Sequence, residues 1–227
     1  MQRKPAVSRT DRQWTGKPVT RVVLASHNQK KAREMRSLLP EGFEVVTADD
    51  AQIQLPEETG ETFEANALLK ARAAAAQSGM LSVADDSGLE IDALDGKPGV
   101  RSARFAEDHG RSVSDEENNR LAIEMLSDTD DSARTARFVS AIAIVDPEGE
   151  ESVVRGTVEG RITDAPRGSN GFGYDPLFIP SGDERTMAEL TDNEKNAISH
   201  RGKAFQLAIP LIVRMATQHD IEQINED

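Results

Sequence analysis

The sequence predicts an α/β fold built on a mixed β-sheet, antiparallel in its middle, and three observations lead to this prediction. Short runs of aliphatic and β-branched residues alternate with longer segments of helical apolar spacing along the chain. The two longest runs, 136–145 and 151–162, are joined by a turn of Asp-Pro-Glu-Gly at 146–149, which predicts an antiparallel hairpin. Because neither an internal repeat nor a linker interrupts the pattern, we expect a single domain over residues 20–227.

The first elements follow a strand–helix–strand order. Residues 21–26 form a short β-branched run, typical of a buried strand. Apolar residues at helical spacing predict a helix over 30–39, which ends at the Pro-Glu-Gly of 40–42. A second strand is expected at 43–46, followed by an acidic loop over 49–61.

An Ala-rich segment predicts the next helix, over 62–77. Thr62 is placed to cap its first turn and Ser78-Gly79 to end it. A short strand at 81–84 then leads into Asp85-Asp86-Ser87-Gly88, expected as a sharp turn, with a further strand at 89–94 and a loop at 95–99.

The second half of the chain places a glycine-rich loop between its strands and its last helices. An amphipathic helix is expected over 115–126, before the hairpin. The glycine-rich loop covers 168–175 and a short strand follows at 176–179. The chain is expected to end in helices near 186–199 and 202–218.

Composition and charge exclude several classes of function. The chain of 227 residues carries a net charge of -13, which argues against general nucleic-acid binding, and it has no cysteine for a disulfide or a Cys-based zinc site. Its four histidines show no H-x-x-x-H pairing, and no apolar run reaches the roughly 20 residues of a membrane helix. We expect a cytoplasmic protein without membrane or nucleic-acid partners.

The first 19 residues differ from the rest because they carry five basic residues and one aspartate. They lack the apolar stretch of a secretory signal. This pattern favours a disordered extension, and a weak nucleic-acid or targeting arm is the alternative.

Asp85 and Asp86 are the first candidates for chemistry. Adjacent carboxylates repel unless a shared proton or a cation compensates them, and Mg²⁺ accepts such oxygen ligands while keeping positions for substrate phosphates. The alternative is a structural turn, because Asp and Ser are common turn formers.

Two further segments carry groups suited to phosphate and metal. Residues 26–31 (Ser-His-Asn-Gln-Lys-Lys) stand between the first strand and helix, where free N–H groups and lysines would bind a triphosphate; an ordinary helix cap is the alternative. Glu57 lies in the acidic loop and could supply a second metal ligand, whereas most such charge clusters are simply solvated. Asn66 and Lys70 follow on the next helix, four residues apart.

Two segments near the C-terminus suit a nucleobase. Gly171-Phe172-Gly173-Tyr174-Asp175-Pro176 combines backbone freedom with aromatic faces for stacking, and a packed turn is the alternative. In the run from Lys195 to Gly202, His200 and Arg201 could bind base edges or phosphates, with Gly202 as the break between two helices. A Ser199-His200 catalytic pair is disfavoured, because adjacent residues point in different directions and no acid orients the histidine.

Together these motifs resemble the inosine triphosphate pyrophosphatase family, also described as XTP/dITP diphosphatases. The resemblance extends from Val22 to about Leu211 and covers five motifs in matching order. They are Ser26-x-Asn28-x-x-Lys31, Glu57-Glu58-Thr59-Gly60, Ala84-Asp85-Asp86-Ser87-Gly88-Leu89, Gly171-Phe172-Gly173-Tyr174-Asp175-Pro176 and Lys195-x-x-x-Ser199-His200-Arg201-Gly202.

The resemblance implies an elongated, two-lobed fold with an active-site cleft between the lobes, usually as a homodimer. It implies hydrolysis of ITP, dITP or XTP to the monophosphate and pyrophosphate, with Mg²⁺ as cofactor. By match to the motifs, the metal ligands would be Glu57 and Asp86, and Asp86 would also accept the proton. The substrate-binding residues would be Ser26, His27, Asn28, Gln29, Lys30, Lys31, Ser87, Phe172, Gly173, Tyr174, Asp175, Lys195, His200 and Arg201.

The proton acceptor is the weak point of this assignment, because a carboxylate bound to Mg²⁺ has a lowered pKa and is a poor base. Our hypothesis is that Asp86 holds the metal, Lys31 neutralises phosphate charge, and Asp85 or metal-bound hydroxide shares the proton. Arg201 or a backbone N–H near Phe172 would recognise the 6-oxo group of the base. His27 stands where the family often has glycine, so its backbone must adopt a conformation open to other residues.

Two alternatives to this function stay open on the sequence. One is a Maf-type pyrophosphatase acting on pyrimidine or methylated nucleotides. The other is a non-enzymatic nucleotide sensor, with the basic tail contacting a partner.

Overall fold

The structure is a computed structural model that describes residues 19–226, with side chains described as far as Gln218. The basic tail expected at residues 1–19 lies, up to residue 18, outside the described residues.

A seven-stranded mixed sheet forms the centre of the molecule, in the order β2-β1-β3-β5-β6-β7, with β4 paired to β3. β1 is parallel to both β2 and β3, whereas every other pair is antiparallel, which confirms the predicted mixed sheet with its antiparallel middle. The strands are β1 (Thr20–Leu24), β2 (Phe43–Thr47), β3 (Ser82–Ile91), β4 (Pro98–Gly99), β5 (Thr135–Val145), β6 (Glu151–Ile162) and β7 (Phe178–Pro180).

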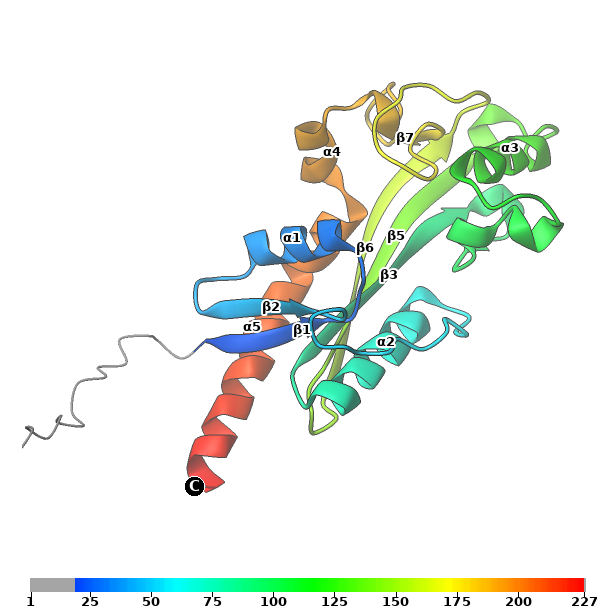
Figure 1. Ribbon diagram of the computed structural model, residues 1–227. Helices are drawn as coiled ribbons and strands as arrows, with labels where there is room; N and C mark the ends of the chain where they lie inside the picture. Colours follow the sequence, from blue (N-terminus) through cyan, green and yellow to red (C-terminus); the bar gives the residue numbers. More distant parts are fainter. Residues whose placement is uncertain (1–18, 227) are drawn as a thin grey trace, which may run out of the picture.

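Helices cover both faces of the sheet. α2 packs on one face against β3 and β5, and α5 packs on the other face against β5 and β6, next to α1. Figure 1 shows an elongated molecule in which the long strands β3, β5 and β6 run from a lobe containing β1, β2, α1 and α2 to a second lobe containing α3 and β7. The helices are α1 (Gln29–Leu38), α2 (Phe63–Ser78), α3 (Asp115–Met125), α4 (Asp192–Ile198) and α5 (His200–Glu226).

The ends of α2 follow the predicted capping residues. The Thr62 hydroxyl accepts the N–H of Ala65 at 3.1 Å, and Gly79 ends the helix in the left-handed conformation at φ 62°. These two caps fix the start of α2 beside the acidic loop and its end just before β3.

Two expectations about how the chain divides into strands and helices are wrong, and a third, the helix break at Gly202, is described with the site. Residues 81–84 and 89–94 are not separate strands joined by a turn: β3 runs without interruption through Asp85 and Asp86, because ten consecutive residues from Ser82 to Ile91 pair with β5. Pairing along a whole neighbouring strand outweighs the local preference of Asp, Ser and Gly for turns. Residues 186–199 do not form one helix either, since a short 3₁₀ turn at Met187–Glu189 precedes α4.

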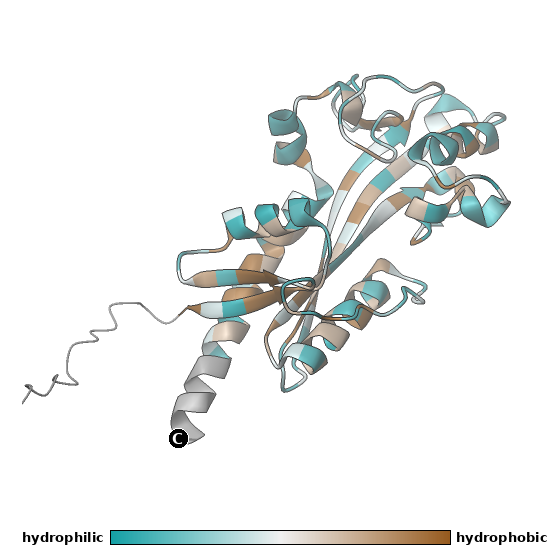
Figure 2. Ribbon diagram, in the orientation of Figure 1, coloured by the Kyte–Doolittle hydropathy of each residue, from teal (hydrophilic) through white to brown (hydrophobic). Residues whose placement is uncertain are grey.

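Apolar cores lie on both faces of the sheet, because successive side chains of a strand alternate between them. Val83 of β3 joins α1 and α5 in one core, and the neighbouring Ala84 joins α2 in another. Figure 2 shows the hydrophobic residues gathered along the strands, with hydrophilic residues over α3 and α4.

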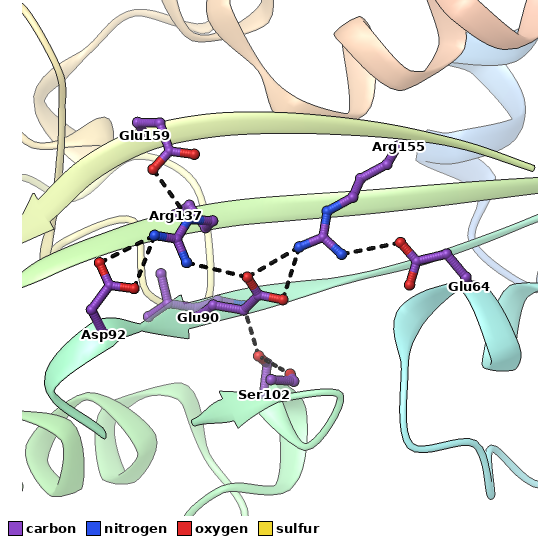
Figure 3. A network of polar contacts seen from close by, with 9 residues as sticks. Glu64, Glu90, Asp92, Ser102, Arg137, Arg155 and Glu159 are labelled. Atoms are coloured by element: carbon purple, nitrogen blue, oxygen red, sulfur yellow. Dashed lines mark hydrogen bonds and ion pairs between the residues drawn. The ribbon is translucent and has the colours of Figure 1, made fainter. Parts of the chain in front are cut away.

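Ion pairs take the place of an apolar core on part of the α2 face (Figure 3). Arg155 of β6 joins Glu64 of α2 at 3.0 Å to Glu90 of β3 at 2.9 Å. Arg137 of β5 extends the network to Asp92 at 2.9 Å and Glu159 at 3.1 Å. These contacts tie the first turn of α2 to three strands of the sheet.

Across residues 19–226, none of the helices combines the length and apolar character that a membrane span requires.

Candidate active site

An unpaired stretch of the β3 edge forms the middle of the candidate site. β1 pairs with β3 as far as Val83, and β4 pairs with it from Leu89, so neither strand covers residues 85–88 between them. The opposite edge of β3 is paired with β5 throughout. We call residues 85–88 the open edge. It presents Asp85, Asp86 and Ser87 on a strand that is held firmly from one side.

Asp85 lies on the sheet face covered by α1 and α5, where it gathers two cations. It is fully buried, with Lys31 Nζ at 2.8 Å and Arg201 Nε at 3.4 Å from its Oδ2. Burial favours the neutral acid, but Lys31 and then Arg201 outweigh it and hold the pKa of Asp85 well below its usual range. Asp85 is therefore ionised, and its buried Oδ1 has no hydrogen-bond partner among the described residues.

The residues before Lys31 form the predicted turn at the start of α1. Asn28 caps the helix, because its Oδ1 accepts the N–H groups of Lys30 at 2.9 Å and Lys31 at 3.4 Å. Ser26 Oγ accepts the N–H of Asn28 at 3.1 Å, and His27 Nδ1 lies 2.6 Å from the Asp49 carboxylate. Within residues 19–226, His27 is not among the non-glycine residues with positive φ, so the turn tolerates it as expected.

Asp86 lies on the opposite face, among residues of α2 and the acidic loop. Its Oδ2 accepts a hydrogen bond from Asn66 Nδ2 at 3.1 Å, and its Oδ1 lies 3.6 Å from Lys70 Nζ. Lys70 also pairs with Glu58. Burial raises the pKa of Asp86, and the nearby charge of Lys70 offsets this in part. A carboxyl group with a raised pKa beside a buried cation is suited to proton transfer.

Lys70 and Asn66 are site residues to which the sequence analysis gave no role. Both are buried, although polar side chains of this kind are mostly exposed on helices. The signal in the sequence was their spacing of four, which places them on one helix face with Ala67, Ala71 and Ala74, the alanines that pack on the sheet.

The acidic loop approaches Asp86 through Glu58 and Gly60. The Gly60 N–H donates to Asn66 Oδ1 at 2.7 Å, while Glu57, the predicted metal ligand, is exposed one residue before Glu58. Among the described side chains, which reach Gln218, no three histidines or carboxylates form a ready-made metal cluster. A divalent ion here would need ligands from the substrate as well as from the protein.

The glycine-rich loop presents one aromatic face and buries the other. Phe172 is 58% exposed, and Lys195 Nζ lies 5.0 Å from the centre of its ring. Asp175 pairs with Lys195 and accepts the Phe172 N–H at 2.8 Å. The Tyr174 side chain is buried instead, and its hydroxyl donates to the Ser102 carbonyl at 2.9 Å. Phe172 thus offers the exposed aromatic face of the loop, and Tyr174 belongs to the core through its side chain.

His200 and Arg201 open α5, and Ser199 ends α4, so the break between the helices comes before His200 rather than at the predicted Gly202. The His200 ring stacks on Phe138, with 5.0 Å between centroids, and its buried Nδ1 has no described partner. Burial, followed by the charges of Arg201 and Lys195, lowers the pKa of His200 to about 3, so the ring is neutral.

The structure brings most of the predicted residues into two groups. The first group surrounds the open edge and contains Asp85, Asp86, Lys31 and Arg201. The second group surrounds the glycine-rich loop and contains Phe172, Asp175, Lys195 and His200. Ser87 joins the first group, because its hydroxyl donates to Asp85 Oδ2 at 3.3 Å. Gly173 belongs to the glycine-rich loop of the second group, and its N–H donates to Asp115 of α3 at 2.7 Å. Gln29 and Lys30 lie exposed on the first turn of α1.

Comparison with known proteins matches this geometry to a family. The profile of the Ham1 family matches residues 22–211. A dITP/XTP pyrophosphatase of Mycobacterium tuberculosis is 49% identical over 205 residues, covering 88% of this chain and 98% of the relative. One of Elusimicrobium minutum is 48% identical over 192 residues, covering 82% and 96%.

Solved structures agree with the sequence relatives. A HAM1 protein from Coxiella burnetii aligns with a TM-score of 0.80 at 42% identity, covering 86% of this chain and all of that one. A structure titled nucleoside-triphosphatase and dITP/XTP pyrophosphatase, from Mycobacterium abscessus, aligns with a TM-score of 0.72 at 48% identity, covering 84% of this chain and 100% of that one. The sequence match over most of the chain and the shared fold together show that this chain belongs to the Ham1 family.

Proposed function

We propose that this protein hydrolyses nonstandard purine nucleoside triphosphates, dITP, ITP or XTP, to the monophosphate and pyrophosphate. The observation that carries the proposal is the open edge of β3, where Lys31 and Lys70 reach adjacent carboxylates from the two faces of the sheet. Two lysines at one strand edge suit a chain of phosphates that lies along it. The relatives named dITP/XTP pyrophosphatases support the purine substrates, and they favour neither a Maf-type enzyme nor a sensor.

In this reaction water adds to the α-phosphorus, the bond from that phosphorus to the oxygen bridging to the β-phosphorus breaks, and pyrophosphate leaves with the electron pair. Lys31, with the N–H groups at the start of α1, stabilises the negative charge of the phosphates. Ser26, His27, Asn28 and Ser87 complete the phosphate contacts.

We assign different tasks to the two aspartates. Asp86 accepts the proton from water, because burial raises its pKa and its carboxylate faces the acidic loop. Asp85 is instead occupied by Lys31 and Arg201, and its lowered pKa makes it a poor proton acceptor. Its task is to hold those two cations in place. We therefore assign Asp85 no share in accepting the proton, although the sequence had left that role open to it.

The donor set around Asp86 fits Mg²⁺. Two carboxylates, those of Asp86 and Glu58, converge on the single ammonium group of Lys70, and Mg²⁺ typically uses one or two carboxylates together with substrate phosphates. Glu57 or Glu58 would hold the ion directly, and Asp86 would reach it only through a water that Mg²⁺ retains, because direct coordination would lower the pKa of Asp86 and make it a poor proton acceptor. When bound, Mg²⁺ would neutralise phosphate charge and polarise the scissile phosphate.

The base is recognised by the second group of residues. Phe172 stacks on the purine, and Lys195 and Asp175 hold the loop that carries Phe172. His200, which is neutral, can contact the base without adding charge. Arg201 donates to the 6-oxo group, which is an acceptor in hypoxanthine and xanthine and an amino donor in adenine.

A substrate panel tests this function. Pyrophosphate release is measured with dITP, ITP, XTP, ATP, GTP, UTP and methylated nucleotides in the presence of Mg²⁺, with Asp86→Asn as the inactive control. We expect kcat/KM to be highest for dITP, ITP or XTP. Preference for pyrimidine or methylated nucleotides would favour the Maf-type alternative, and binding without pyrophosphate release would favour the sensor.

The homodimer stays a prediction from the resemblance, and the cytoplasmic location stays a prediction from the composition. Light scattering on the purified protein measures its mass against the 24.7 kDa of one chain.

A further inference from the structure

A hollow of about 480 Å³, lined by Glu58 and Gly60 on one side and by two arginines on the other, lies beside the residues that contact Asp86. One wall is residues 57–60 of the acidic loop, and the other is Val100, Arg101 and Arg104, which follow β4. We call it the arginine hollow. Val100 is the single aliphatic side chain in its lining, which therefore suits a charged ligand better than a base.

Hydrogen bonds connect both walls to the open edge of β3. On the acidic-loop side, Glu58 pairs with Lys70 and Gly60 donates to Asn66, and both Lys70 and Asn66 contact Asp86. On the arginine side, Ser102 Oγ accepts the N–H of Leu89 at 2.8 Å, at the point where the open edge ends. The two walls of the arginine hollow are therefore attached to residues that contact Asp86 and to the end of the open edge.

The cations of that centre are already paired. Lys31 and Arg201 share Asp85, and Lys70 is placed between Glu58 and Asp86. These contacts leave little net positive charge for a triphosphate, which carries about four negative charges.

Arg104 is different from the arginine beside it. Arg101 is held by both oxygens of Asp108, at 2.7 and 2.6 Å. Among the side chains that the structure describes, up to Gln218, none forms a hydrogen bond or ion pair with Arg104, which is exposed in the hollow. The charge of Asp108 does extend to Arg104, but its carboxylate is occupied by Arg101.

We propose that Arg104 binds the terminal phosphates of the substrate and retains the pyrophosphate that leaves. This inference rests on the proposed function. A guanidinium group presents paired donors that match two phosphate oxygens, and Arg104 has all its donors available. The base is bound elsewhere, at Phe172 and Lys195, so Arg104 acts on the phosphate end of the nucleotide.

Binding of the two products separates this role from others. Inorganic pyrophosphate and inosine monophosphate are titrated separately into the full-length wild-type protein and into Arg104→Ala, with Mg²⁺ present. We expect the Kd for pyrophosphate to rise about tenfold or more in the variant, since a hydrogen bond to a charged group is worth about 1.5–3 kcal/mol. The Kd for the monophosphate should stay unchanged, and Arg104→Lys should restore part of the pyrophosphate affinity.

Arg120→Ala is the matched control, because Arg120 is an exposed arginine of α3 that pairs with Glu117 and does not line the hollow. It should alter neither affinity. An unchanged pyrophosphate Kd in Arg104→Ala would overturn the proposal, and so would an equal weakening of both products, which indicates a structural role. If the wild-type protein bound pyrophosphate through Arg104 but released none from dITP, the proposed function would fail while Arg104 remained an anion ligand.

Discussion

The carboxylates of Asp85 and Asp86 lie on opposite faces of β3, although the two residues are adjacent in the sequence. Their pKa values shift in opposite directions, because Asp85 meets Lys31 and Arg201, whereas Asp86 is buried with weaker compensation from Lys70. The alternation of a regular strand thus gives two neighbouring acids two different environments.

This difference predicts opposite effects on stability. Asp85→Asn leaves two cations without their buried counter-ion, so we expect the free energy of unfolding to fall by about 3–5 kcal/mol. Asp86→Asn removes a charge that burial disfavours, so stability should stay level or rise while kcat drops by about 10²-fold or more. Urea unfolding and pyrophosphate release measure the two effects. Similar losses of stability in both variants would contradict the assignment.

Removing the charge of Lys70 is predicted to strengthen divalent-ion binding. Lys70→Met leaves the carboxylates of Glu58 and Asp86 without compensation, and their repulsion favours a bound cation. We therefore expect a lower Kd for Mg²⁺ by isothermal titration, together with a lower kcat/KM for dITP, because a phosphate-binding charge is lost. Weaker Mg²⁺ binding in the variant would show that Lys70 does not compete with the ion.

Phe172 is predicted to contribute to substrate binding through stacking on the base, and not to the stability of the fold. Because its ring is more than half exposed, Phe172→Ala should leave the free energy of unfolding unchanged. Loss of one stacked base costs about 1–3 kcal/mol, so kcat/KM for dITP should fall about tenfold or more. Phe172→Trp should retain activity, and pyrophosphate binding should be equal in all three proteins. A loss of pyrophosphate affinity in Phe172→Ala would argue against separate base and phosphate ends.

Gly156 is predicted to affect base selection without touching the nucleotide. It lies on β6 where α5 crosses, and an added Cβ would meet the His200 carbonyl and, at 2.5 Å, the Ala204 nitrogen. Gly156→Ala should therefore displace the first turn of α5, cost about 1–3 kcal/mol of stability and lower the kcat/KM ratio of ITP to ATP. Thr157→Ala, on the opposite face of β6, is the control. If the kcat/KM ratio of ITP to ATP were unchanged in Gly156→Ala, the position of α5 would have no effect on base selection.

His200 is predicted to make the fold sensitive to acid. Its pKa is about 3 in the folded protein and near its ordinary value of 6.5 in the unfolded chain, so below pH 6.5 the unfolded chain binds the proton more readily. The stability linked to His200 is complete above pH 6.5 and is lost as the pH falls toward 3. Urea unfolding between pH 7 and pH 4 should show a shallower decline for His200→Gln than for the wild type. If the free energy of unfolding fell equally with pH in both proteins, His200 would not be the cause of the acid sensitivity.

Much of this fold is predictable from the sequence where local signals are strong. The hairpin of β5 and β6 follows from two long strand-like segments around a turn that contains Pro147 and Gly149, and the ends of α2 follow from Thr62 and Gly79. The course of β3 was not predictable in the same way. Asp85-Asp86-Ser87-Gly88 has the composition of a turn, and the pairing with β5 that keeps it extended is a tertiary interaction.

The residues of the site were easier to identify than their surroundings. The resemblance to the family's motifs identified Lys31, Asp86 and Phe172 as candidate site residues. The ionic pairing of Asp85 and the burial of Lys70, in contrast, depend on which sheet face each residue occupies. That depends on strand continuity, which was predicted wrongly. Arg104 had no signal of its own, since its significance comes from a hollow formed by two distant loops.

The open edge of β3 also affects how readily the protein aggregates. An exposed strand edge offers unpaired N–H and C=O groups to other chains and is a common starting point for aggregation. Here the uncovered stretch is confined to residues 85–88 between β1 and β4, too short to template a long foreign strand, and it carries two acidic side chains. The carboxylates that we propose for the reaction therefore also discourage strand addition, and replacing both with apolar residues would remove that protection.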